Sequence, residues 1–326
     1  MFEFASVGPT KIDCDGCHNF VYVSVKNDNN NETFDKTENE KNKIVLIEKF
    51  QSIARKIKEM EVYDDDIWVV SFPKSGTTWT MEMTWLLNND LDYEMAKDIE
   101  LSRRFPMLEI SGVLNLFPEG SVDNVINLTR PRHIKTHLNY AMLPDKLWTS
   151  RAKIFYVARN PKDCIVSYFH HSRHITGYHG TMDDFVETFL QDKVLYTPFF
   201  EHILGFWNIR HRPNMMFLMY EDMQADLLSI LKKISEFLGK NYTENQLLKL
   251  VDHLSAKNMR KNPSCNNDFF LSEARKRNNP VKDNQFTFIR KAKVGAYKEE
   301  LSEKYIQRID EWTAESLKNT DFRFKC

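Results

Sequence analysis

The residues best suited to chemistry lie in the stretch Pro73 to Trp79, which reads PKSGTTW. It offers one cation together with hydroxyl and backbone N–H donors, from Lys74, Ser75, Gly76, Thr77 and Thr78. Such a set suits a tetrahedral anion such as phosphate or sulfate. The lysine precedes the glycine and no glycine leads the loop, so this is not the GxxxxGK[ST] sequence of ATP and GTP hydrolases. An ordinary strand–helix turn with a surface lysine is the alternative interpretation.

The elements that flank this loop can be predicted from hydrophobic periodicity. Ile67 to Phe72 is apolar apart from Ser71, which predicts a strand buried on both faces. Pro73 ends that run, and from Thr77 onward apolar residues recur at helical intervals. A helix start leaves backbone N–H groups without partners and carries partial positive charge, so we expect an anion site there.

Other functional side chains follow three further predicted strands. Lys135 and His137 close the run that begins at His133, Arg159 follows Lys153 to Val157, and Tyr220 follows Met215 to Met219. Strands alternating with helices predict an α/β fold, a single domain with a central parallel β-sheet flanked by helices. Ligands bind at the carboxyl ends of such strands, so these residues should meet there.

Capping signals predict several helices around the sheet. Asn160 with Pro161 suits one helix start, and Thr181 with Asp184 suits another. The remaining helices are expected over Ile44 to Met60, Leu227 to Leu238 with Gly239 as C-cap, Thr243 to Leu254 with Gln246 completing a capping box, and Leu301 to Leu317.

Three stretches lack a helical or strand pattern. Lys26 to Lys43 is polar and predicts a mobile segment, so we divide the chain into an N-terminal segment, 1–43, and a domain, 44–326. Leu91 to Ile126 is expected to face the substrate. Asn262 to Gln285 is expected to be a long loop.

Composition limits the class of partner. The 45 Lys and Arg residues against 46 Asp and Glu leave a net charge of −1, which argues against nucleic acid as a partner. No apolar run is long enough for a membrane span, and no signal peptide or disulfide framework is visible, so a cytoplasmic location is expected. Cys14, Cys17 and His18, like His170 with His174, have metal-ligand spacing, but we expect no metal.

Five segments in order resemble those of the cytosolic sulfotransferases, which transfer a sulfuryl group from 3′-phosphoadenosine 5′-phosphosulfate (PAPS). PKSGTTW resembles the family's 5′-phosphosulfate loop, and KTH from Lys135 resembles the segment with its catalytic base. The other three are YVARNPKDCIVSY from Tyr156, resembling the 3′-phosphate segment, YEDM from Tyr220, resembling the adenine-side strand end, and FIRK from Phe288, resembling the C-terminal phosphate clamp.

The resemblance implies a role for each matching residue. His137 would be the general base, because an imidazole titrates near neutrality. Lys74 and Lys135 would stabilise the transferring group, and Ser167 would contact the 3′-phosphate and restrain Lys74. The implied cofactor-binding residues are Lys74, Ser75, Gly76, Thr77, Thr78, Trp79, Arg159, Ser167, Tyr220, Leu254, Phe288, Ile289, Arg290, Lys291 and Ala292, and the product is adenosine 3′,5′-bisphosphate (PAP).

The chain departs from the family pattern in three places. Ala292 stands where the family has glycine, and Leu254 and Ala256 stand where it commonly has threonine and an aromatic residue. Of the family's dimer motif only Lys298 is present, so a homodimer is possible but not implied.

The acceptor is expected to be a small, largely apolar molecule with a hydroxyl or amine. Aromatic and Met residues around 91–117, together with Tyr168, Phe169, Phe199 and Phe200, suit an apolar pocket, although core packing explains them equally well. Three other functions stay open: dehydration of an alcohol through its sulfate ester, a nucleotide-phosphate kinase, and a nucleotide-binding protein without turnover.

Overall fold

The protein is described from a computed structural model that covers residues 1–8, 10, 12, 19–25, 42–114, 119–277 and 286–325. The string Cys14, Cys17 and His18, and most of the polar stretch from Lys26 to Lys43, lie outside the described residues.

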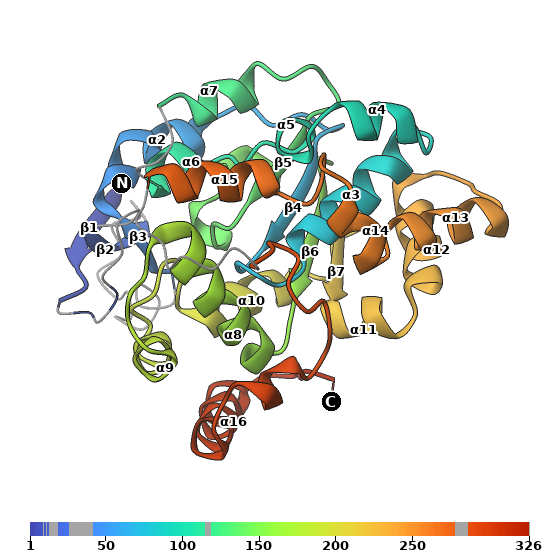
Figure 1. Ribbon diagram of the computed structural model, residues 1–326. Coiled ribbons are helices and arrows are strands. Elements are labelled where there is room, and N and C mark those ends of the chain that lie inside the picture. The colour runs from blue at the N-terminus through green and yellow to red at the C-terminus, as the bar shows by residue number, and fades with distance from the viewer. Residues whose placement is uncertain are drawn as a thin grey trace.

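A four-stranded parallel sheet forms the centre of the fold, as predicted (Figure 1). Its strand order is β5-β4-β6-β7, and the strands are β4 (Ile67–Ser71), β5 (His133–Thr136), β6 (Lys153–Ala158) and β7 (Met215–Met219). Val69 of β4 lies opposite Lys135 of β5 and Phe155 of β6. The register brings the carboxyl ends of the central strands to one edge of the sheet.

Alternating side chains of the strands feed two separate cores. In β4, Trp68 and Val70 belong to one core with Ile154 and Tyr156 of β6. The other core takes the residues between them, such as Val69. Because β4 is buried on both faces, its sequence is apolar up to Ser71 rather than alternating.

Helices cover both faces of the sheet (Figure 1). Buried residues place five helices with the first core: α2 (Gln51–Glu59), α8 (Pro161–His171), α9 (Met182–Leu190), α10 (Phe199–Trp207) and α16 (Glu303–Leu317). Five others pack in the second: α3 (Thr77–Asn88), α11 (Tyr220–Ala225), α12 (Leu227–Leu238), α13 (Glu244–His253) and α14 (Ala256–Lys261). The predicted caps are present, including the Thr243 capping box.

Short elements make up the segments that had no sequence pattern. Between α3 and β5 these are α4 (Tyr93–Asp98), α5 (Leu101–Arg104), α6 (Ile110–Val113) and α7 (Ser121–Ile126). The prediction of a long loop over 262–285 is wrong for residues 268–277, which form the helix α15 (Asp268–Arg277), and residues 278–285 lie outside the described residues. The apolar residues Leu271 and Ala274 of α15 pack in a small third core, too few to give a clear helical period.

The N-terminal residues form a sheet that the sequence did not predict. Strands β1 (Phe2–Ser6), β2 (Phe20–Val25) and β3 (Ile44–Ile47) pair antiparallel. The expected helix over Ile44 to Met60 is therefore wrong at its start, since α2 begins at Gln51. Four consecutive buried apolar residues suit a strand, and Val45 also exchanges backbone hydrogen bonds with the segment 196–197, at 2.7 Å each.

Candidate active site

The loop between β4 and α3 takes a conformation that depends on Gly76. Its φ is +107°, in the left-handed region, and its carbonyl accepts the Thr80 N–H at 3.0 Å. A Cβ added at Gly76 would lie 2.7 Å from Cδ2 of Tyr220. Only glycine fits this turn, so the start of α3 can approach the end of β7 closely.

Lys74 lies among other cations at this edge of the sheet. Its Nζ sits 4.0 Å from the centre of the Phe288 ring. Burial, together with the charges of Lys135, Arg159 and Arg290, lowers the pKa of Lys74 to about 7. Cations crowded together in a buried place favour binding of a multiply charged anion.

Arg159 connects the loop to the start of α8. Its Nη1 donates to the Lys74 carbonyl at 3.0 Å, and its guanidinium lies 4.2 Å from the centre of the Tyr220 ring. Asn160 caps α8 by accepting the Lys162 N–H. The first turn of α8 also holds the C-terminal segment, because Asp163 accepts hydrogen bonds from the backbone N–H groups of residues 295 and 297.

The imidazole of His137 is oriented by the neighbouring strand. Its Nδ1 lies 2.7 Å from the carbonyl oxygen of Ser71, so Nδ1 carries the proton and Nε2 keeps its lone pair. Burial lowers the pKa of His137 well below the ordinary value, and the charge of Lys135 adds to that effect. The Ser71 hydroxyl also bonds to that of Thr77 at 2.7 Å, which ties the base to the start of α3.

The segment after Phe288 brings Arg290 and Lys291 to the same site. Arg260 holds it by donating to the carbonyls of Ile289 and Arg290, at 2.8 and 2.6 Å. Two acidic residues pair with these cations, at distances of 2.5 Å for Arg290 with Glu300, 2.8 Å for Lys291 with Glu299 and 3.0 Å for Lys291 with Glu300. His170 also pairs with Glu300.

Trp79, Tyr220 and Leu254 lie together on the far side of the loop. The Trp79 indole N–H donates to the Leu254 carbonyl at 3.0 Å, and its ring meets the Tyr220 ring edge-on at 5.8 Å. Position 254 therefore contributes a backbone carbonyl, whatever its side chain.

A single cavity of about 520 Å³ collects nearly all of the residues singled out in the sequence. They are Lys74, Gly76, Thr77, Thr78, Trp79, Lys135, His137, Arg159, Ser167, Tyr220, Leu254, Phe288, Ile289, Arg290, Lys291 and Ala292. Among the catalytic and cofactor-binding residues Ser75 is the exception, because it is buried beneath the loop, with its hydroxyl 4.0 Å from the Cys164 sulfur. Of the four aromatic residues expected in the apolar pocket, Tyr168 lines the cavity, but Phe169, Phe199 and Phe200 pack in the first core instead. The remaining lining is mostly apolar and includes Phe20, Phe105, Met107, Ile110, Leu114 and Phe270.

Comparisons with known proteins agree with this geometry. A family model described as "Sulfotransferase domain" matches residues 64–321. The chain belongs to the sulfotransferase family. Luciferin sulfotransferase of Photinus pyralis is 38% identical, covering 84% of this chain and 77% of its own, and human sulfotransferase 1C2 is 32% identical, covering 82% and 88%.

Solved structures resemble this sulfotransferase over different lengths. Retinol dehydratase, in a complex with retinol and PAP, has a TM-score of 0.84 at 28% identity and covers 99% of each chain. A mouse sulfotransferase complexed with PAP has a TM-score of 0.67 at 27% identity and covers 85% of this chain and 93% of its own. PAPS is the sulfuryl donor in this family, and the enzyme is a sulfuryl transferase for small acceptors.

The described part of the chain contains no helix that is long and apolar enough to span a membrane. The described residues also hold no cluster of three or more His, Cys, Asp or Glu side chains with the arrangement of a metal site. His170, His171 and His174 serve other contacts: an ion pair, the cavity lining and a stacked ring.

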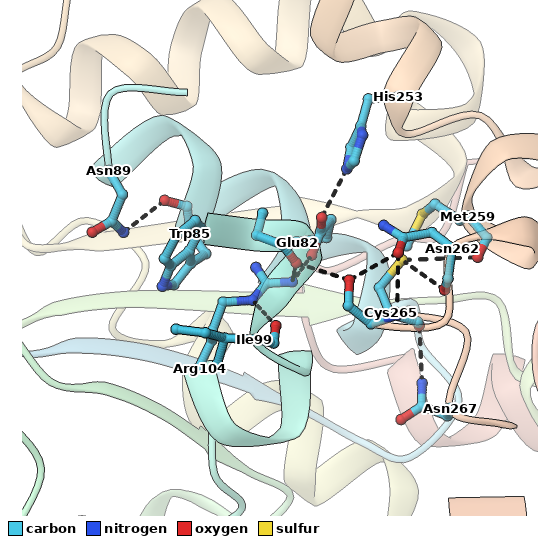
Figure 2. A network of polar contacts seen from close by, with 12 residues as sticks. Glu82, Trp85, Asn89, Ile99, Arg104, His253, Met259, Asn262, Cys265 and Asn267 are labelled. Carbon is cyan, nitrogen blue, oxygen red and sulfur yellow. Dashed lines mark hydrogen bonds and ion pairs between the residues drawn. The ribbon is translucent and has the colours of Figure 1, made fainter. Parts of the chain in front are cut away.

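A buried polar network behind the loop helix holds the walls of this sulfotransferase site together (Figure 2). Glu82 of α3 accepts from Arg104 of α5 at 2.7 Å and lies 2.8 Å from Nε2 of His253. Arg104 also lies against the Trp85 ring, at 4.6 Å. The network joins the donor-binding helix α3 to α5 and to the end of α13, which both come later in the chain.

Sequence reasoning missed residues that act through this machinery. Glu109 and Tyr196 contact the His137 region, and Glu299 and Glu300 pair with the basic clamp. Glu299 and Glu300 offered a signal in the sequence, because two adjacent acidic residues begin eight residues after Lys291. Glu109 had no such signal, because it stands in a segment without periodicity.

Proposed function

We propose that this sulfotransferase transfers the sulfuryl group of PAPS to the hydroxyl, or amine, of a small and largely apolar acceptor, with His137 as general base. The observation that carries this proposal is the hydrogen bond from His137 Nδ1 to the Ser71 carbonyl. That bond leaves the lone pair of Nε2 for the acceptor's proton. The lowered pKa of His137 keeps the imidazole unprotonated, as a base must be.

The donor fits the cations gathered at the strand ends. PAPS, when bound, supplies an activated sulfuryl group on a phosphate leaving group. Lys74, whose pKa is lowered by burial and by the neighbouring cations, would hold the phosphosulfate together with the backbone donors of the loop. Arg159, Ser167, Arg290 and Lys291 would hold the 3′-phosphate, because guanidinium groups bind phosphate in a bidentate manner.

Transfer itself needs proton removal and charge stabilisation. His137 Nε2 takes the proton as the acceptor oxygen bonds to sulfur and the bond from sulfur to the bridging oxygen breaks. Lys74 and Lys135 stabilise the negative charge that develops on the departing phosphate and the sulfuryl oxygens, which lowers the barrier more than it stabilises the bound reactants. The proton ends on His137, and the electron pair leaves with the phosphate.

The acceptor would occupy the apolar end of the cavity, opposite the basic end. Phe105, Met107 and Ile110 lie there together with Phe20 of β2. Such a wall binds hydrocarbon or aromatic surface and contributes little binding free energy for a polar molecule. We therefore propose an apolar alcohol, phenol or amine as acceptor.

Calorimetric titration with PAP, with 5′-AMP as the control that lacks the 3′-phosphate, tests donor binding first. Clearly tighter binding of PAP is expected.

Turnover of PAPS with a panel of apolar alcohols, phenols and amines then tests the reaction. His137→Ala should lower kcat by about 100-fold or more while PAP still binds. Full activity of His137→Ala would contradict the mechanism, and tight PAP binding without turnover on any acceptor would favour a binding protein.

Dehydration of an alcohol through its sulfate ester is a second candidate. It is favoured by the full-length likeness to retinol dehydratase, which covers 99% of each chain, whereas the mouse sulfotransferase covers 85% of this one. Product mass separates the two reactions: a stable product gains a sulfuryl group in transfer and loses water in dehydration.

Location and assembly are further parts of the proposal. We place the enzyme in the cytoplasm because Cys164 and Cys265 are buried free thiols. A homodimer is possible, although the family's dimer motif is largely absent. Cell fractionation and sedimentation of the purified chain test these two statements, and neither nucleic acid nor a membrane is proposed as a partner.

A further inference from the structure

Glu109 is a buried carboxylate that contacts the proposed base through its main chain. Its side chain is fully buried. Oε1 accepts the backbone N–H of His137 at 2.7 Å and the hydroxyl of Tyr196 at 3.2 Å. Glu109 also stands at the start of α6, whose first residue, Ile110, lines the acceptor end of the cavity. One carboxylate therefore connects the base to the acceptor wall.

The position of the His137 ring depends on hydrogen bonds of its main chain, on one hydrogen bond of the ring and on one aromatic neighbour. Its backbone N–H bonds to Glu109, its carbonyl accepts from His202 at 2.8 Å, and Nδ1 bonds to Ser71. The Tyr196 ring stands edge-on to the imidazole at 5.5 Å. Because the Ser71 bond selects the tautomer, any shift of the main chain at His137 weakens the bond that keeps Nε2 unprotonated.

A helix cap would be the ordinary explanation for an acidic residue at this place, but the geometry argues against it. Glu109 is the N-cap residue of α6, yet its side chain makes no capping hydrogen bond. The side chain points across to β5 and to Tyr196 instead. Its hydrogen-bonding capacity serves the base and not the helix.

The charges around Glu109 fit this arrangement. Burial raises the pKa of Glu109, and the His137 N–H and the Lys135 charge act in the opposite direction. Burial lowers the pKa of Lys135, and Glu109 acts against that shift. Other titratable groups near the imidazole are His202, Lys74 and His171, and the charges of His202 and Lys74 disfavour its protonation. Glu109 is the acidic group that faces Lys135 on this side of the site.

We propose that Glu109 is a positioning residue for the base, acting with Tyr196 to hold His137 so that Nδ1 reaches the Ser71 carbonyl and Nε2 faces the acceptor. The inference rests on the proposed role of His137 and adds the residues that make it effective.

Nitrogen NMR of protein labelled at its ten histidines tests the inference without an acceptor. The His137 signal is assigned by its loss in His137→Gln, and spectra are taken with PAP present and absent. Glu109→Gln keeps an oxygen acceptor and should retain the Nδ1–H signal. Glu109→Ala should give the signal of mixed tautomers at His137 and leave His253 unchanged.

Glu82→Ala is the matched control, because Glu82 is an equally buried carboxylate that bonds to His253 at 2.8 Å. It should move the His253 signal and leave His137 alone, while lowering Tm. If Glu109→Ala proves too unstable, Tyr196→Phe keeps the ring and removes the hydroxyl, and should shift His137 in the same direction by less. An unchanged His137 signal in both variants, or equal changes at His137 and His253, would overturn the inference.

Kinetics add an independent readout once an acceptor is identified. Glu109→Ala should lower kcat by about 100-fold and change the Kd of PAP by less than about twofold, and Glu109→Gln should recover most of kcat. A loss confined to PAP binding would contradict positioning of the base. Failure to find any acceptor would remove the proposed function and leave the NMR result on His137 intact.

Discussion

The donor end and the acceptor end of the cavity are built in different ways. The donor end consists of strand ends and the helix starts that follow them, with Lys74, Arg159 and Tyr220 placed directly after buried strands. The acceptor end consists of short helices, the N-terminal sheet and α15. Pairing of parallel strands fixes the first set. The second set is held by packing, by antiparallel pairing of the N-terminal strands and by backbone hydrogen bonds between separate segments, such as those that join Lys135 to Pro106 and Leu108. Residues of the acceptor wall can therefore be substituted without disturbing the donor site.

Gly76→Ala should break the donor end most severely. The substitution puts a Cβ 2.7 Å from the Tyr220 ring and forces a left-handed φ of +107° on alanine. We expect PAP affinity to fall by about 100-fold or more, because backbone strain alone costs about 1–2 kcal/mol and the loop must also move. Calorimetry measures this. Gly120→Ala, which also has a positive φ but open space, is the control; equal losses in both would show that the close approach to Tyr220 is unimportant.

The contrast between the two ends also decides what could be predicted from the sequence. The strands at His133–Thr136 and Met215–Met219 were predicted to the residue, the second of them because it is a short apolar run. The strand at Ile44–Ile47 was read as the start of a helix, because its partner β2 is remote in sequence and the pattern continues into α2. Non-local pairing leaves no local signal.

The same limit applies to side chains. Lys74, Lys135 and Arg159 could be selected because they follow strands, and the sheet brings them together. Glu109 could not, because its importance comes from contact with His137, 28 residues away in the chain. A residue that acts through another residue shows itself only in three dimensions.

The affinity of the donor end for PAP should fall as pH rises above about 7. The pKa of Lys74 is lowered to about 7 in the free protein, so the ammonium loses its proton there. A bound anion favours the protonated form, so binding above that pH must take up a proton, and affinity should fall by up to about tenfold per pH unit. Calorimetry between about pH 7 and 9 measures the slope. Lys74→Arg, which stays charged, should flatten it; a steep slope in that variant would assign the proton to another group.

Phe20→Ala should alter the acceptor end alone. Phe20 is half-buried in β2 and lines the cavity. Removing it takes away about 1 kcal/mol of apolar contact, so KM for an apolar acceptor should rise about fivefold, with an unchanged Kd for PAP. Phe4→Ala is the matched control, because Phe4 packs on the same core from the neighbouring strand without lining the cavity. A change in PAP binding would show that the two ends are coupled.

Glu300→Gln should strengthen the donor end. Glu300 pairs with Arg290 and Lys291, so a phosphate that binds these cations must do so beside a carboxylate. Burial raises the pKa of Glu300, but hydrogen bonds with His170, Lys291 and Arg290 outweigh it, and the lowered pKa keeps Glu300 ionised. Removing its charge should raise PAP affinity about three- to fivefold, the size of a partly exposed ion pair. Weaker binding in Glu300→Gln would mean that the carboxylate organises the clamp instead of competing with the ligand.

Ala292→Gly should give the smallest effect, at the position where the chain departs from the family's glycine. Ala292 has a φ of +49°, so the left-handed backbone is present although the residue that favours it is not. Glycine would remove strain of about 1–2 kcal/mol and cost about 0.5–1 kcal/mol in the unfolded chain, which leaves a net stabilisation of about 0.5–1 kcal/mol.

Thermal unfolding of Ala292→Gly measures this gain as a rise in Tm of about 1–4 °C. Ala256→Gly is the control, because Ala256 begins α14 and should lose stability when replaced by glycine. If Ala292→Gly lowers Tm, the left-handed conformation of Ala292 does not destabilise the folded protein. If it raises Tm without changing PAP affinity, the backbone at residue 292 already has the geometry that the clamp requires, and the departure from the family affects stability alone.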